Sequence, residues 1–533
     1  MARFVDKPFE IPQEHHEHAH GDEEQGRAAP HFQDGQSVTE FSTTTSEKAG
    51  SSKYASSTIG IEHAKASKGN ERKLVRKLDV VILPLAALLY LAAYLDRGNL
   101  GNARLQGLEE SVLGNDDTRY SIALSCFYIT YIVLSVPGTL LAKQFLPSTT
   151  IAFGALTWSI AASCQAAVTN PAGLYVCRLF VGVGEACFGQ AMAVYFTFFY
   201  TRKEIAKRIG LFISAGSLAG AFSGLIAYGV SHIKSSPIPQ WRILFLIEGL
   251  PSLALAIVVF FCLPSRPEKT RYLNEEQRTV ACTRLNADGA PTESTGIDWR
   301  AVRYTLLNWR TYIVAVAYSA MNLGLSSTSG YLPTIIKGLG YTNAKAQIMS
   351  VPPYAVSLVV MLLICTYSDR AQTRGIPIMC VFATGIVGWS ILLGVSPVDP
   401  SSSDLKVRYF GCFCVVSAAY SAIPLIMSWQ ASNVAGESQK AVALGMLNSV
   451  GQCLSILGSF IFPKNEGPRY VKAASLNIAF QCLGLLISLG MTLYYRWENR
   501  RRDKREGGKP AKGLRIEGLH EDYDHAVGFR YTP

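Results

Sequence analysis

Long apolar segments, separated by short polar loops, dominate this chain of 533 residues. A window of about 19 residues, the length of helix that crosses a bilayer, finds twelve such segments. They lie at 79–103, 120–142, 149–168, 172–199, 209–230 and 241–263 in the first half and at 309–333, 350–367, 376–395, 407–431, 441–462 and 474–495 in the second. Because lipid offers backbone polar groups no partner, segments of this length must be helical. The pattern predicts an all-α polytopic membrane protein with twelve transmembrane helices.

The grouping of these segments, six on each side of a polar insert, predicts two pseudo-symmetric six-helix bundles. We divide the chain into a disordered cytoplasmic N-terminal tail (1–78), an N-terminal bundle (79–263), a cytoplasmic central loop (264–308), a C-terminal bundle (309–495) and a basic cytoplasmic C-terminal tail (496–533). The tail cluster of His15, His16, His18 and His20 is more often incidental than a metal site in such an acidic, flexible segment. We expect no metal or other cofactor.

Charged residues avoid the apolar segments. The stretches 1–79, 264–308 and 496–533 hold 54 of the 89 charged residues, which excludes an ordinary soluble enzyme. With both tails in the cytoplasm, that side of the membrane holds 36 Lys and Arg residues and the other side 11, as the positive-inside rule requires. We therefore expect a monomeric plasma-membrane protein with both termini cytoplasmic. Its basic C-terminal tail is expected to rest on anionic lipid rather than to bind nucleic acid.

The few ionisable side chains inside the spans mark the chemistry, because each costs at least about 2.5–3.5 kcal/mol there. No span contains histidine, so any proton relay must use carboxylates. The first apolar run, Val80–Leu95, has sixteen residues and is too short to cross a bilayer alone. Its helix must continue through Asp96 and Arg97, which favours a cavity-facing position for both over an interfacial one.

The fourth span carries Arg178, Gly182 and Glu185 at i, i+4 and i+7, a spacing that places them on one stripe of the helix. The nearby Gly184 and Gly182 permit close approach of another helix. A carboxyl buried at Glu185 is suited to gain and lose a proton near neutral pH. The alternative is a static ion pair of Glu185, with Arg178 or across to another helix.

The remaining polar positions have weaker interpretations. Glu248, in the sixth span, is either interfacial or paired with Arg242, and we favour a structural role. Asp369, Arg370 and Arg374 after the eighth span are expected to form a cytoplasmic hinge that locks neighbouring helix ends. A ladder of polar side chains is a candidate lining of the transport route, although such residues also serve helix packing: Asn322, Ser326, Ser327 and Thr328, then Trp429 and Asn433, then Asn448 and Gln452.

Several motifs resemble those of a known family. Twelve spans with Asp-Arg-x-x-x-Arg (369–374) after the eighth resemble the major facilitator superfamily. The segments YLDRGNLGNA (94–103), WRILFLIEGLP (241–251), YLPTIIKGLGY (331–341), SVPPYAV (350–356) and NVAG (433–436) look more narrowly like its anion:cation symporter family, in the fungal branch of allantoate, nicotinate, pantothenate and biotin permeases. The resemblance runs from about Arg72 to Tyr495. It departs from the superfamily pattern at Lys143–Ser148 and from the narrower family at Gln190.

The resemblance implies proton-coupled movement of a small organic anion by alternating access. It implies that Asp96 and Glu185 carry protons, that Arg97 meets the substrate carboxylate, and that Arg178 modulates Glu185. With the polar ladder, this makes the expected substrate site Arg97, Arg178, Asn99, Asn322, Ser326, Trp429 and Asn448. An efflux carrier for an acidic metabolite or toxin is the alternative, and a non-transporting nutrient sensor a less favoured one. The substrate itself stays open.

Overall fold

The protein folds into helices alone over the residues that the computed structural model describes, 49–144, 147–233, 236–287, 298–395, 402–510 and 522–533. Residues 1–65 and 66–533 form two separate units. The predicted histidine cluster and the first 48 residues of the predicted tail lie outside the described residues. The described part of that tail, from residue 49 on, is helical. It has no proline before Pro84, so the first transmembrane helix continues upstream of its apolar part.

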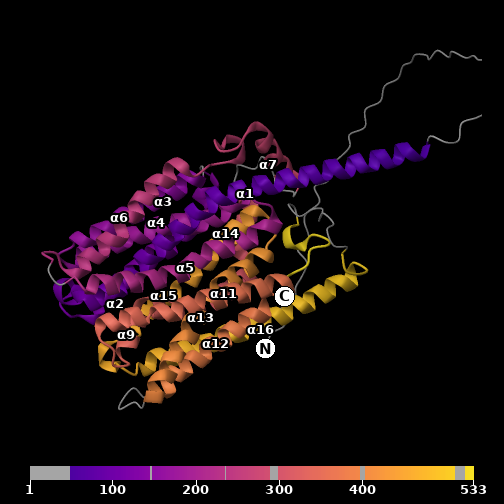
Figure 1. The fold of residues 1–533 in the computed structure, drawn as a ribbon. Helices are drawn as coiled ribbons and strands as arrows, with labels where there is room; N and C mark the ends of the chain where they lie inside the picture. The colour runs from indigo at the N-terminus through magenta and orange to yellow at the C-terminus, as the bar shows by residue number, and fades with distance from the viewer. Residues whose placement is uncertain (1–48, 145–146, 234–235, 288–297, 396–401, 511–521) are drawn as a thin grey trace, which may run out of the picture. The chain divides into compact units, whose positions relative to one another are not determined.

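The helices of residues 66–533 form two groups (Figure 1). The first group comprises α1 (Ala49–Ala103), the π-helix η1 (Arg104–Leu113), α2 (Asp117–Gln144), α3 (Pro147–Cys164), α4 (Pro171–Thr197), α5 (Arg202–Ser231) and α6 (Gln240–Cys262). The second comprises α9 (Trp309–Lys337), α10 (Asn343–Met349), α11 (Val351–Ala371), α12 (Gly375–Gly394), α13 (Ser402–Ser432), α14 (Glu437–Gly451), α15 (Cys453–Phe460) and α16 (Val471–Arg505). Along the chain, α7 (Glu275–Ala287) and α8 (Trp299–Leu307) come between the two groups. The predicted all-α polytopic architecture is confirmed.

Two predicted spans differ from the others in character. Among the described residues, ten helices are long and apolar enough to cross a membrane. The other two predicted spans, 149–168 and 309–333, form α3 and α9. α3 packs on α4 and α6 and exposes Phe153 and Ile160 on its other side, whereas α9 packs on α13 to α16. α9 is buried along nearly its whole length. Its polar side chains therefore contact protein rather than lipid, so α9 can lie in the bundle with fewer apolar residues than a lipid-facing helix.

The central loop divides between the two bundles. On the N-terminal side, Arg284 of α7 forms an ion pair with Glu204 (3.1 Å) and donates to the carbonyl of Phe199 (2.8 Å). On the other side, α8 packs on α14 through Val302. We call the end of the bundles that carries α7, α8 and residues 522–533 the tail face, and the opposite end the distal face.

Close helix contacts in the N-terminal bundle depend on glycine, as the sequence suggested for the fourth span. A Cβ added to Gly184 of α4 would lie 2.5 Å from the carbonyl oxygen of Gly154 and 2.6 Å from the backbone nitrogen of Trp158, both in α3. A Cβ on Gly182 would lie 2.4 Å from the carbonyl oxygen of Phe127 in α2. These backbones cannot move apart without separating α4 from both neighbours.

Gly184→Ala is therefore expected to destabilise the N-terminal bundle by a few kcal/mol, the range found for overpacking in tight cores. The yield of monodisperse protein and its melting temperature in detergent would both fall. Gly229→Ala in α5 is the matched control, because a Cβ there meets nothing within 4 Å and alanine favours a helix by about 1 kcal/mol. Equal melting temperatures for the two variants would contradict this account of the α3–α4 contact.

Candidate functional site

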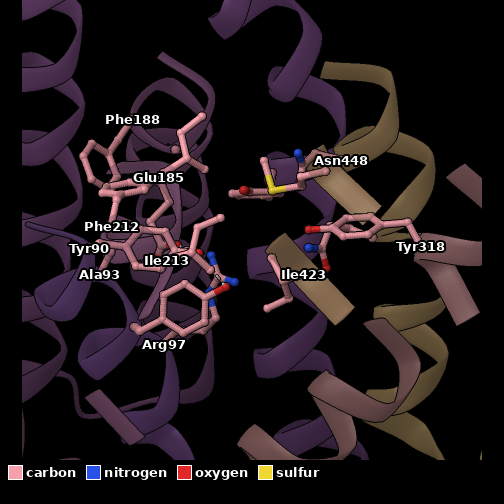
Figure 2. A pocket seen from close by; sticks show the side chains of 16 residues that line it. Tyr90, Ala93, Arg97, Glu185, Phe188, Phe212, Ile213, Tyr318, Ile423 and Asn448 are labelled. Atoms are coloured by element: carbon pink, nitrogen blue, oxygen red, sulfur yellow. Dashed lines mark hydrogen bonds and ion pairs between the residues drawn. The ribbon is translucent and has the colours of Figure 1, made fainter. Parts of the chain in front are cut away.

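A cavity with an empty volume of about 600 Å³ lies between the two bundles (Figure 2). The N-terminal bundle lines it with Tyr90, Ala93, Tyr94, Arg97, Tyr131, Glu185, Phe188, Gly189, Ile209, Phe212 and Ile213. The C-terminal bundle lines it with Tyr318, Ile423, Met427, Asn448 and Gln452. The first wall is aromatic and carries both charged side chains of the cavity. The second is neutral.

The charged pair of the cavity is Arg97 of α1 with Glu185 of α4, which form an ion pair and a hydrogen bond. The guanidinium also lies over the rings of Tyr94 (4.6 Å to the ring centre), Phe127 (4.7 Å) and Tyr131 (5.4 Å). Such cation–π contacts stabilise a desolvated cation. Of the static pairs considered for Glu185, the cross-helix one is present, and Arg178 is not its partner.

Asp96 and Arg178 lie behind this wall and line neither described cavity. Both are almost completely buried, at 2% and 1% exposure. Arg178 donates to the backbone carbonyl of Asp96 (3.4 Å) and interacts electrostatically with Asp96 and Glu185. Two of its guanidinium nitrogens and the Oδ2 atom of Asp96 have no hydrogen-bond partner. Asn99, also buried, has both amide atoms unpartnered, so the interior of this bundle holds unused hydrogen-bonding capacity.

The neutral wall is built around amides. Asn448 lines the cavity directly, as does Gln452, which donates from Nε2 to Oδ1 of Asn322 (3.3 Å). Asn322 therefore does not line the cavity itself but fixes the side chain of Gln452, which does. Figure 2 shows Asn448, Tyr318 and Ile423 across the cavity from Arg97 and Glu185. Gln452, which the sequence offered as one member of the ladder, is a lining residue because α14 ends and α15 begins around it.

Two more residues expected at the substrate site, in addition to Arg178, Asn99 and Asn322, do not line the cavity. Ser326 donates to the carbonyl of Leu323 (3.0 Å) and packs where α9 crosses Gly458 of α15. It serves helix packing, the alternative interpretation of the ladder. Trp429 lies near the tail-face end of α13, where its Nε1 donates to the carbonyl of Thr532 (2.9 Å). Periodicity placed these two side chains on helices correctly but did not say which face meets the cavity.

The C-terminal segment 522–533, which we call the clasp, binds the tail face of the C-terminal bundle. Thr532 exchanges two hydrogen bonds with the Asn433 side chain (2.7 and 3.1 Å). Asp524 pairs with Arg310 at the start of α9 (2.7 Å), and Arg502 of α16 donates to the carbonyl of Asp524 (2.7 Å). The sequence predicted only a membrane-surface role for this tail. The pairing was hidden because its partners are spread over four distant helices.

The predicted hinge is in contact with the clasp. Arg374 pairs with Asp369 (2.6 Å) and donates to the hydroxyl of Ser368 (3.1 Å). The backbone N–H groups of Arg374 and Gly375 donate to the carbonyl of Pro533 (2.9 and 3.3 Å). Arg370 is exposed, and no ion pair joins it to any described residue. Of the three residues predicted to form a hinge, Asp369 and Arg374 are therefore joined to each other, and Arg374 is also bonded to the end of the clasp.

Glu248 is neither interfacial nor paired with Arg242, in contrast to the sequence-based expectation. It is 2% exposed. Arg242 instead donates to the carbonyl of Val168 (3.3 Å) and lies over the ring of Trp241. The helix α6 turns the two side chains to different faces, since six residues are not a whole number of turns.

A second cavity, with an empty volume of about 420 Å³, lies toward the distal face. It is lined by Tyr94, Arg97, Gly98, Asn102, Gly220, Ser223, Gly224, Ser329, Pro333, Ser350, Tyr354 and Tyr420. Arg97 and Tyr94 line both cavities and thus form the partition between them.

Comparison with known proteins gives consistent matches. The family model of the Major Facilitator Superfamily matches residues 86–459. "MFS-type transporter efuF" of Hormonema carpetanum is 33% identical over 445 residues, covering 82% of this chain and 88% of that one. "Major facilitator-type transporter hxnP" of Emericella nidulans is 31% identical over 467 residues, covering 86% and 93%.

Solved structures match in fold. The proton:xylose symporter XylE superposes with a TM-score of 0.62 at 14% identity, covering 77% of this chain and 95% of that one. A bacterial homologue of the lysosomal transporter Spinster superposes with a TM-score of 0.56 at 13% identity, covering 78% and 96%.

The clasp is expected to loosen only in acid. Although burial opposes ionisation of Glu506, hydrogen bonds from Arg530 and the Gly528 N–H outweigh it and hold the pKa of this carboxyl below its ordinary value. A lowered pKa adds stability above the ordinary value of about 4.5, which is lost as pH falls through the lowered one. A nitroxide at Val527, which is 75% exposed, should become mobile below about pH 4. In Glu506→Gln it should already be mobile at pH 7. Unchanged mobility in that variant would contradict the role of Glu506.

Proposed function

We propose that this chain, which belongs to the Major Facilitator Superfamily and is therefore a secondary transporter rather than an enzyme, carries a small organic anion together with protons. It is an integral multi-pass membrane protein that binds a small-molecule substrate. The observation that carries the proposal is the Arg97–Glu185 pair in a cavity whose other wall is neutral. We place the protein in the plasma membrane as a monomer, with both termini in the cytoplasm.

The coupling follows from competition for one guanidinium. While Glu185 is ionised, it occupies Arg97, and a substrate carboxylate has no free cation to bind. When Glu185 takes up a proton, Arg97 is left without a counter-ion in a desolvated, aromatic pocket, which favours binding of an anion. Loss of that proton restores the internal pair and expels the anion. Protonation and anion binding are thereby linked in the same cavity.

Asp96 and Arg178 supply a second linked pair one layer deeper. Their electrostatic contact with each other and with Glu185 means that a proton on Asp96 alters the net charge that Glu185 experiences. With both carboxyls protonated, Arg97 and Arg178 give the site a positive charge that an anion neutralises. The bundles then rock about the occupied site and open toward the other side.

The amide side chains of the neutral wall favour a substrate that carries a polar group as well as a carboxylate. Asn448 and Gln452, together with Tyr318, present neutral donors and acceptors opposite the cation. A small carboxylate with a polar group at its other end satisfies both walls, as vitamin-type or ureide-type acids such as nicotinate, pantothenate or allantoate do. The alternative function is export of an acidic metabolite, and deletion of the gene distinguishes it from import. Cells that lack the gene should resist a toxic analogue of the substrate if the protein imports it, and should be hypersensitive to the analogue if the protein exports it.

Glu185→Gln and Asp96→Asn should each abolish pH-driven accumulation, because a neutral amide cannot gain or lose the proton. Uptake of a panel of labelled carboxylates into transport-deficient yeast, at pH 5 and 7 with and without protonophore, measures this. Exchange of internal for external substrate should persist. Glu110→Gln is the matched control, since this carboxylate in the same half is exposed. Concentrative uptake by either variant would remove that residue from the coupling mechanism.

Arg97→Lys should raise the KM for the anion by about 10-fold to 100-fold, corresponding to loss of a charge-assisted, two-pronged hydrogen bond. Lysine keeps the charge but not the planar fork that reaches a carboxylate. Surface abundance, measured by biotinylation, should stay near that of the parent. An unchanged KM at pH 5 would show that the substrate does not bind Arg97.

A further inference from the structure

A third carboxyl group lies buried beside the proposed coupling site, and the mechanism above does not use it. Glu248 of α6 interacts electrostatically with Asp96, and among the described residues no cation lies within ion-pairing distance of it. Its Oε2 atom has no hydrogen-bond partner, and its Oε1 atom accepts only from the hydroxyl of Ser223 (3.4 Å). Glu185 and Asp96 each have an arginine nearby, and Glu248 has none.

The elements that pack around Glu248 supply, among the described residues, no unpaired cation close enough to stabilise its ionised form. α3 and the 3-10 helix η2 (Gln165–Ala167), which pack on α6, contain no acidic or basic residue. The charged residues of α5 lie at its tail-face end, and Arg104 of η1 is paired with Glu109 (2.9 Å). An ionised Glu248 would be an unpaired buried charge next to the Asp96 carboxyl, an arrangement that strongly favours the neutral form. In this conformation Glu248 therefore holds a proton.

A chain of hydrogen bonds connects Glu248 to the contact between the bundles. The hydroxyl of Ser223, which donates to Glu248, accepts from Nδ2 of Asn102 (2.8 Å). The backbone carbonyl of Asn102 in turn accepts from Nε2 of Gln347 (3.5 Å), which belongs to α10 of the C-terminal bundle. Ser223 and Asn102 also line the distal cavity.

The bundles meet closely around this chain, at what we call the distal contact. A Cβ on Gly101 would lie 2.9 Å from the carbonyl oxygen of Gly330, and one on Gly220 would lie 2.6 Å from the ring of Tyr354. The hydroxyl of Tyr120 donates to the carbonyl of Gly330 (3.2 Å). Opening toward the distal face must break these contacts together with the Asn102–Gln347 hydrogen bond, and water then reaches Ser223.

We propose that Glu248 is a third proton-binding group, whose protonation stabilises the closed distal contact and whose ionisation accompanies its opening. The reason is desolvation. Closure withdraws Glu248 from water and leaves it only one hydroxyl, so the neutral form is favoured, whereas the opened contact hydrates it and permits ionisation. The inference deepens the proposed proton coupling by naming a residue that links proton uptake to movement of the bundles.

The test measures opening of the distal contact directly. Ser329, which lines the distal cavity, is replaced by cysteine, and its modification by a membrane-impermeant maleimide from the distal side is timed without substrate between pH 5 and 8. The unsubstituted chain supplies the background of its native cysteines. Each rate is divided by that of Ser111→Cys, an exposed position at the same end, at the same pH, because maleimide reacts with the thiolate, whose fraction rises with pH in any cysteine. This labelling ratio for Ser329→Cys should be about 10-fold higher at pH 8 than at pH 5, because ionisation of Glu248 favours the opened contact. With Glu248→Gln added, the labelling ratio should be low at both pH values and should differ less than 2-fold between them.

Matched variants separate the possible causes. Glu110→Gln, which removes an exposed carboxylate, should leave the pH dependence intact. Ser223→Ala removes the hydroxyl that joins Glu248 to Asn102 but keeps the carboxyl group, and it should raise the labelling ratio at pH 5 to near its pH 8 value. It also keeps the test valid if Glu248→Gln fails to fold. Full pH dependence in Glu248→Gln, or slow labelling at pH 5 in Ser223→Ala, would overturn the proposal.

This readout is independent of the proposed substrate. If labelling follows pH through Glu248 but no organic anion is transported, the proposed anion transport fails and the role of Glu248 stands. If anion accumulation depends on Glu185 and Asp96 while labelling ignores Glu248, the proposed function stands and this inference fails.

Discussion

The burial of ionisable groups without water is the constraint on which the rest of this structure depends. In the N-terminal bundle, Asp96, Arg97, Arg178, Glu185 and Glu248 are all withdrawn from solvent or nearly so. A charge in such surroundings must be balanced by an opposite charge or cancelled by a proton. Five groups with three carboxyls and two guanidiniums cannot all be ionised and balanced. Under the proposed mechanism, at least one carboxyl of the closed, empty site is therefore protonated, and binding of an anion changes the number of bound protons.

This balance is available only because the helices approach closely. Gly182 and Gly184 let α4 lie directly on α2 and α3, which brings Glu185 to Arg97 on α1. The C-terminal bundle contributes no charge to the cavity and offers amides instead, with Gln452 held by Asn322. The N-terminal bundle thus carries both charged side chains of the cavity, and the C-terminal bundle supplies a neutral surface whose side chains do not change protonation.

Different contacts join the helices at the two ends of the molecule. At the distal face, backbone-to-backbone contacts at Gly101 and Gly330 join the bundles, and nothing covalent prevents their separation. At the tail face, the clasp ties α9, α12, α13 and α16 into one body through Asp524, Thr532 and Pro533. The C-terminal bundle is thereby braced as a unit at the end where Asp369 and Arg374, the residues predicted to form a hinge, lie. A rigid half is what rocking motion about a central site requires.

The sequence by itself determined the elements and the inventory of charge. Twelve apolar segments, an unavoidable continuation of the first helix through Asp96 and Arg97, and the stripe carrying Arg178 and Glu185 all follow from length, hydropathy and helical period, which are local properties. Only the tertiary structure decided which groups meet. It paired Glu185 with Arg97 rather than Arg178, took Trp429 and Ser326 away from the cavity, and left Glu248 without a cation. The physical reason is that period places a side chain on a helix face, whereas its partner depends on how neighbouring helices are rotated and how closely their glycines let them pack.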